Sequence, residues 1–103
     1  MHFIIHCLDH ADALQRRLAN YEAHKTYLAH ANIRTIISGP LLSDDGKTMI
    51  GSCFLVEAES KEEVVEFNRN DPFNAANVWR QVDIHAFLKR VDNTTHESVL
   101  SPR

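Results

Sequence analysis

The chain has 103 residues, 44% of them hydrophobic and 24% charged, which is the composition of one ordinary globular domain. Its formal net charge is -3, and acidic and basic residues are mixed along the chain, so no extended basic surface is expected to bind nucleic acid. No apolar run approaches the roughly 20 residues of a membrane span, and Met1 leads into a strand-like run without a basic leader. We therefore expect a cytoplasmic protein without nucleic-acid or membrane partners.

The cysteines and histidines form no recognisable metal or redox motif. Cys7 and Cys53 lie far apart, each in an apolar alternating run, and they make neither a CxxC motif nor a disulfide framework. Both are interpreted as small buried hydrophobic residues. The seven histidines lack the spacing of metal ligands, so no metal site is expected.

The first half of the chain predicts a strand, a long helix and a second strand. Residues 3–8 form a short apolar run rich in strand formers. Residues 11–31 contain strong helix formers and neither glycine nor proline. Residues 33–42 are rich in β-branched side chains. Four residues of the helix share one stripe at helical spacing, expected to face the core: Leu14, Leu18, Tyr21 and Leu28.

A hairpin is predicted next. Residues 43–47 read Ser-Asp-Asp-Gly-Lys, which is typical of a turn, and residues 49–58 supply the returning strand. Gly51 within that strand indicates a bulge or a close approach of another backbone.

The last third predicts a helix and a final strand. Ser60 is a good N-cap, and Glu63 completes a capping box for the helix that follows. The pair Asp71-Pro72 is expected to stop this helix. Apolar and polar residues then alternate through a strand over residues 78–88.

The order of elements is therefore β-α-β-β-α-β, the split βαβ of a ferredoxin-like α+β fold with both helices on one face of an antiparallel sheet. We expect one domain over residues 1–90 and a polar tail over residues 91–103. Because so short a chain leaves much of its surface exposed, a homodimer or larger homo-oligomer is expected.

Two residues suggest acid–base chemistry. His24 lies about 60° from the centre of the helical stripe, at about 100° per residue, so it is at the border of the predicted buried face. A carboxylate beside it would prepare it as a general acid or base. Asp71 ends the second helix, which the fold would place beside the first. The alternatives are a boundary histidine bonded to backbone or water, and an aspartate that bonds only its own backbone.

Other residues could hold a substrate. Arg17 lies two turns before His24 on nearly the same line of the helix, where it could anchor an anion or simply extend along the helix edge. Gly39-Pro40 and Gly51-Ser52 lie on partner strands, and the hairpin register could bring them together. Ser52 offers a hydroxyl donor but has no neighbouring base in the sequence, so it is a poor nucleophile and equally an ordinary strand residue.

Several residues and short motifs follow one another in a characteristic order and spacing: Asp9, Arg17-Leu18, His24, Gly39-Pro40, Gly51-Ser52 and Asp71-Pro72-Phe73. In these markers the chain resembles the YciI-like (YCII-related) family over residues 1 to about 90. The resemblance implies a ferredoxin-like fold that dimerises through its sheets into an α/β barrel, with a His–Asp pair that would be His24 and Asp71 here. It also implies cofactor-free acid–base chemistry on a small, perhaps aromatic, anionic molecule, because members include a dehydrochlorinase of a chlorinated hydroxyhydroquinone.

The chain departs from the family pattern in three places. Tyr21 stands where a helix arginine is often found, which removes a cation beside the site. Asn77 stands where a glycine is usual, although asparagine also adopts a left-handed backbone conformation. The hairpin loop over residues 43–47 is shorter than is usual.

The resulting hypothesis is a cofactor-independent enzyme that catalyses an elimination or isomerisation, with His24 as general acid or base and Asp71 orienting it. One alternative is a non-catalytic dimeric module that binds a small molecule or a protein. Another is a cofactor-free monooxygenase, which rests on fold analogy alone. The residues expected to bind substrate are Arg17, Tyr21, Gly39, Pro40, Ser52 and Phe73.

Overall fold

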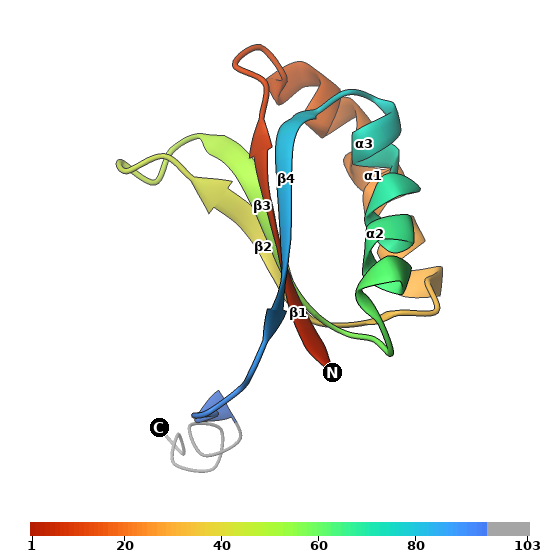
Figure 1. The fold of residues 1–103 in the computed structure, drawn as a ribbon. Helices are drawn as coiled ribbons and strands as arrows, with labels where there is room; N and C mark the ends of the chain where they lie inside the picture. Colours follow the sequence, from red (N-terminus) through yellow and green to blue (C-terminus); the bar gives the residue numbers. More distant parts are fainter. Residues whose placement is uncertain (95–103) are drawn as a thin grey trace, which may run out of the picture.

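The computed structural model describes residues 1–94 and contains a four-stranded antiparallel sheet in the order β2-β3-β1-β4. Figure 1 shows the helices together on one face of this sheet. The predicted α+β order is confirmed, with one short helix added. Most of the predicted tail, residues 95–103, lies outside the described residues. The elements are β1 (His2–Asp9), α1 (Leu14–His30), β2 (Arg34–Leu42), β3 (Met49–Glu57), α2 (Lys61–Arg69), α3 (Pro72–Ala75) and β4 (Trp79–Phe87).

The hydrophobic core lies between the sheet and the helices. Alternation along β1 points Phe3, Ile5 and Cys7 toward the helices, each at most 2% exposed. Their partners on β3 face the same way, and these are Val56, Phe54 and Ser52. Alternation along each strand therefore sets which side chains reach the helical layer.

Over the described part of the chain, no helix combines the length and apolar character of a membrane span.

The two cysteines lie on opposite faces of the sheet. Cys7 is fully buried, and burial raises the pKa of its thiol from 9.0 to about 12, so the thiol stays protonated at neutral pH. Cys53 is the partner of His6 on the face turned away from the helices, and it is partly exposed. The interpretation as a buried hydrophobic residue is thus correct for Cys7 and wrong for Cys53.

The helical stripe predicted to face the core is mostly exposed. Leu14, Leu18 and Tyr21 are 39%, 52% and 49% exposed, and only Leu28 packs partly against the core. The prediction of the buried face of α1 is therefore wrong.

Two polar residues are buried on α1 instead. Arg17 is 4% exposed and His24 is 8% exposed. Such burial is tolerated only where each polar group finds a partner. Asp9 at the end of β1 pairs with Arg17, and Asp71 before α3 pairs with His24. The buried face of α1 is therefore the one that carries Arg17 and His24, and Leu14 and Leu18 lie on its exposed side.

The segment between α2 and β4 differs in one respect from the sequence prediction. Ser60 caps α2 as expected, with its hydroxyl accepting from the backbone N–H of Glu63 at 3.3 Å. Asp71-Pro72 does end this helix, but it also begins α3, since the Asp71 carboxylate accepts from the N–H of Phe73 at 2.8 Å. Asn77 then takes a left-handed φ of 59° before β4, the conformation that asparagine was expected to allow at this position.

Gly51 provides a test of the sheet geometry. A β-carbon at this position would overlap the backbone carbonyl oxygen of Cys7 on the neighbouring strand, which confirms the predicted close approach. Replacing Gly51 with alanine is expected to lower the free energy of unfolding by about 3 kcal/mol, because two backbones must move apart. Gly39→Ala is the matched control, since nothing lies within 4 Å of a β-carbon there. Urea denaturation measures both, and equal effects would contradict the prediction.

Candidate active site

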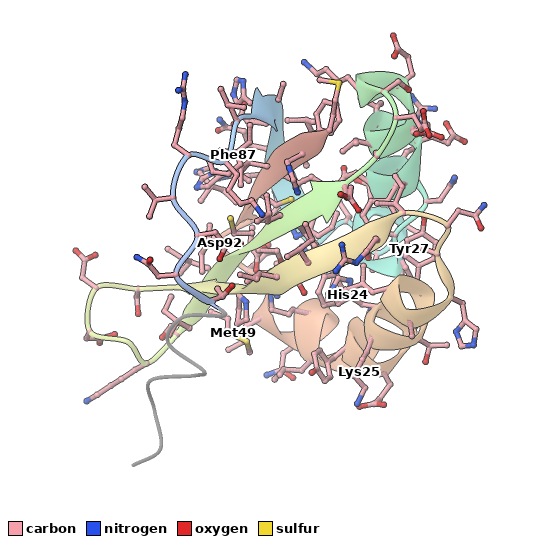
Figure 2. All side chains as sticks on the ribbon, turned by 90° about the horizontal axis from the view of Figure 1, so that it is seen from below. His24, Lys25, Tyr27, Met49, Phe87 and Asp92 are labelled. Atoms are coloured by element: carbon pink, nitrogen blue, oxygen red, sulfur yellow. The ribbon has the colours of Figure 1, made fainter. Side chains whose placement is uncertain are left out.

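A cleft of about 480 Å³ lies between α1 and the strands β2 and β3. The residues predicted to bind substrate all line it, together with His24, whereas Asp71 is buried and reaches the site through His24. Pro40 and Ser52 are partners in the β2–β3 register, so the hairpin does bring the two glycine-containing segments together. Figure 2 labels His24 and Lys25 on α1 and Met49 at the start of β3, and all three line the cleft.

His24 and Asp71 form a buried hydrogen-bonded pair. Nδ1 of His24 lies 2.9 and 2.8 Å from the two carboxylate oxygens of Asp71, which is 1% exposed. A carboxylate accepts hydrogen bonds, so the pairing assigns the ring proton to Nδ1 and leaves Nε2 unprotonated in the neutral ring. The N–H of Phe73 also donates to Asp71 and fixes its orientation. The pair can therefore present a basic Nε2 from a fixed ring.

Two phenylalanines hold the imidazole in place. The ring of Phe73 stacks on His24 with centroids 4.0 Å apart and an angle of 9° between the planes. Phe54, from β3, meets the imidazole edge-on at 5.9 Å. These contacts restrict rotation of the His24 ring and make its surroundings largely apolar.

Arg17 is already paired with a carboxylate. Its Nε and Nη2 donate to the two oxygens of Asp9 at 2.8 and 2.9 Å, and both side chains are 5% exposed. Its guanidinium carbon lies 4.8 Å from the centroid of Phe73. The positive charge that the sequence suggested for an anionic substrate is therefore largely balanced within the protein.

Ser52 lies between two donors at the floor of the site. Nη2 of Arg17 donates to its hydroxyl oxygen at 2.7 Å, and Nε1 of Trp79 donates to it at 3.3 Å. Ser52 is only 3% exposed yet lines the cleft. No imidazole or carboxylate accepts its proton among residues 1–94, so the geometry agrees with its weakness as a nucleophile.

The mouth of the cleft is apolar, and Lys25 lies close by in an ion pair with Glu22 at 3.5 Å. Leu18, Leu28 and Met49 line it alongside Tyr21. The ammonium group of Lys25 lies 5.5 Å from the centroid of the Tyr21 ring.

Within residues 1–94, no three histidine, cysteine, aspartate or glutamate side chains are arranged to hold a metal ion.

The sequence of this chain matches the model of the YCII-related domain over residues 1–88. The chain belongs to the YCII-related domain family. It is also 31% identical over 96 residues to Protein YciI of Escherichia coli O6:H1, an alignment that covers 86% of this chain and 98% of that protein. Protein YciI of Shigella flexneri matches to the same extent.

Two solved structures share the fold. The 5-chloro-2-hydroxyhydroquinone dehydrochlorinase TftG from Burkholderia phenoliruptrix AC1100, in complex with 2,5-dihydroxybenzoquinone, superposes with a TM-score of 0.74 at 35% identity. That match covers 85% of this chain and 94% of TftG. A protein of Arabidopsis thaliana superposes with a TM-score of 0.50 at 14% identity, over 88% of this chain and 96% of that one, and shares the fold alone.

The residues predicted from the sequence line the cleft or contact it through His24, but three further contributors were not predicted. Asp9 was noticed only as a strand end and a family marker, although a carboxylate there is what allows Arg17 to be buried. Trp79 carried a signal, because the N–H of a buried indole needs an acceptor, and Ser52 supplies it. Phe54 follows from alternation along β3, which places it on the same face as Ser52.

Proposed function

We propose that this protein is a cofactor-independent acid–base enzyme acting on a small, ring-shaped molecule, with its active site in the cleft of residues 1–90. The observation that carries the proposal is the buried His24–Asp71 pair, whose Nδ1 contact at 2.8 Å leaves Nε2 on a cleft-lining ring. A histidine oriented by a carboxylate is the arrangement that general-base catalysis requires.

In the proposed reaction, Nε2 of His24 removes a proton from the substrate. The electron pair left behind forms a new double bond, and a leaving group on the neighbouring carbon departs with its own electron pair. In an isomerisation, the proton returns instead to a different atom. Asp71 stabilises the imidazolium that forms, because its carboxylate already contacts Nδ1. Fixing the ring in advance lowers the cost of reaching this geometry.

The substrate class follows from the walls of the cleft. Leu18, Leu28, Met49 and Phe54 give it an apolar lining, while Ser52 supplies a polar group at its floor. TftG, a family neighbour, acts on a chlorinated hydroxyhydroquinone. We therefore propose a hydroxylated aromatic or quinone-like substrate, held by apolar contacts around the ring and by hydrogen bonds at its oxygen atoms.

A screen tests the proposal. The protein is incubated with 5-chloro-2-hydroxyhydroquinone and with hydroxyhydroquinones that carry other leaving groups, and released halide and ultraviolet absorbance are followed. Turnover above the uncatalysed rate supports the enzyme. Binding without turnover, seen by calorimetry and unchanged by His24→Ala, would favour the non-catalytic binding module instead. Oxygen consumption with a phenolic substrate would favour a monooxygenase.

We also propose that the protein is a homodimer formed through the sheet face turned away from the helices (Figure 1). Ile4 and Leu55 are cross-strand partners near the middle of that face. Ile37 and Phe87, on the outer strands, are 56% and 41% exposed. Apolar side chains gathered on one open face are typical of an interface.

Leu55→Lys is expected to convert the dimer to a monomer, because it places a charge in the middle of the proposed interface. Analytical ultracentrifugation measures the mass. Leu14→Lys is the matched control, since Leu14 is an exposed leucine on the helical side of the molecule and should leave the mass unchanged. A monomeric wild-type protein, or a Leu55→Lys variant that stays dimeric, would contradict the proposed interface.

A further inference from the structure

We infer that the hydroxyl of Ser52 donates a hydrogen bond to an oxygen atom of the substrate, so the site selects molecules with a carbonyl, quinone or phenolate oxygen close to the proton that His24 removes. This inference rests on the proposed function and adds the group that recognises the substrate. It assigns Arg17 and Trp79 as positioning residues that act through Ser52.

The direction of the Ser52 hydrogen bond follows from counting donors and acceptors. A serine hydroxyl has one proton to donate and two lone pairs that accept. Arg17 and the Trp79 indole can only donate, and both donate to this oxygen, at 2.7 and 3.3 Å. The two lone pairs are therefore occupied, and only the proton remains available. No group among residues 1–94 accepts that proton, and Ser52 lines the cleft, so a bound molecule is the acceptor that completes the site.

The position of the donors is held from behind. Asp9 binds Arg17 through two hydrogen bonds, which fixes the guanidinium plane and directs Nη2 at Ser52. The Trp79 indole packs edge-on against Phe54 and Phe73, with ring centroids 6.1 and 5.8 Å apart. Both donors are thus set in the folded protein before a ligand arrives, which is the preorganisation that electrostatic stabilisation requires.

Ser52 and His24 enter the cleft from different layers. Ser52 lies on β3 in the sheet, whereas His24 lies on the helix α1, where Figure 2 labels it. A flat molecule between them can meet Nε2 of His24 and the Ser52 hydroxyl together. As His24 takes a proton, negative charge moves onto the substrate oxygen, and the Ser52 hydrogen bond strengthens there. Arg17 polarises that hydroxyl through Nη2 while its own charge stays balanced by Asp9.

This arrangement recognises an oxygen atom, neutral or anionic, by hydrogen bonding and does not depend on an unpaired cation. Position 21, one helical turn before His24, is a tyrosine without a charge, and Arg17 is paired with Asp9. Lys25, beside Tyr21 at the rim of the cleft, is itself paired with Glu22 at 3.5 Å. A carboxylate ligand would therefore find no unpaired cation at the floor, but a quinone oxygen would find a donor.

Isothermal titration calorimetry with 2,5-dihydroxybenzoquinone tests the inference, since binding is measured without turnover. Ser52→Ala is expected to weaken binding about 10-fold, and Ser52→Thr should restore most of it. Ser38→Ala is the matched control: Ser38 also lines the cleft, but among residues 1–94 no side-chain donor orients its hydroxyl as Arg17 and Trp79 orient that of Ser52, so affinity should change less than about 2-fold. Circular dichroism confirms that each variant is folded.

A double-mutant cycle separates positioning from a general structural effect. Trp79→Phe is expected to weaken quinone binding about 3-fold in the wild-type background and to have no further effect in Ser52→Ala. Additive losses would mean that Trp79 does not act through Ser52. A wild-type protein that does not bind the quinone, or a Ser52→Ala variant that binds it equally well, would overturn the inference. The proposed function is tested separately, by whether turnover depends on His24, so it can stand even if this inference fails.

Discussion

Replacing His24 with glutamine is expected to lower kcat by about 100- to 10,000-fold on any substrate that the screen identifies, with a much smaller change in KM. Glutamine keeps a side chain of similar length that can still bond Asp71, but it cannot accept a proton at neutral pH. The loss should therefore fall on the chemical step. Steady-state kinetics, together with circular dichroism, measures the effect on a folded variant.

The control for this prediction lies on the same helix. His30 is exposed near the end of α1, and its Nδ1 lies 2.9 Å from the backbone oxygen of Thr26 alone, so His30→Gln should leave kcat within about 2-fold of wild type. If His24→Gln retained wild-type kcat, the acid–base proposal would be wrong, and a binding role for the cleft would take its place.

Replacing Asp9 with alanine is expected to lower the free energy of unfolding by about 3–5 kcal/mol, because it leaves the Arg17 charge buried without a partner. The pair is bidentate, and both side chains are only 5% exposed, so solvent offers little compensation. Urea denaturation at neutral pH measures the change.

Two further variants isolate the buried charge. Asp12→Ala removes the partner of Arg16, in an ion pair where the aspartate is 85% exposed, and should cost less than about 0.5 kcal/mol. The double variant Asp9→Leu, Arg17→Met removes both charges and should recover much of the lost stability. An Asp9→Ala protein as stable as Asp12→Ala would show that the Arg17 pair contributes little.

The two predictions concern adjoining parts of one buried polar network. Arg17 and His24 approach the same ring, Phe73, one through its guanidinium and the other by stacking. Asp9 and Asp71 supply the carboxylates on either side. The charges that hold the site together are thus balanced within the protein. This leaves Nε2 of His24 and the hydroxyl of Ser52 as the groups offered to a ligand.

Local features of the sequence were sufficient to predict most elements. A run of strand formers predicted β1, alternation of apolar and polar residues predicted β4, and the Ser60 cap with Glu63 predicted the start of α2. These signals depend on residues a few positions apart, so they can be recognised from the sequence without knowledge of the tertiary structure. The short helix α3 was missed, because Asp71-Pro72 was interpreted as a stop when it is also a cap.

The order and spacing of the family residues also indicated the cleft, and its proposed substrate-binding residues, Tyr21 and Phe73 among them, do line it. What the sequence by itself determined is therefore the element order, the family and several of the residues that line the cleft. Only the tertiary structure decided which face of α1 is buried. Hydrophobic periodicity favoured Leu14 and Leu18, but the carboxylates that make burial of Arg17 and His24 favourable come from β1 and the start of α3, and their approach depends on how the helices pack on the sheet.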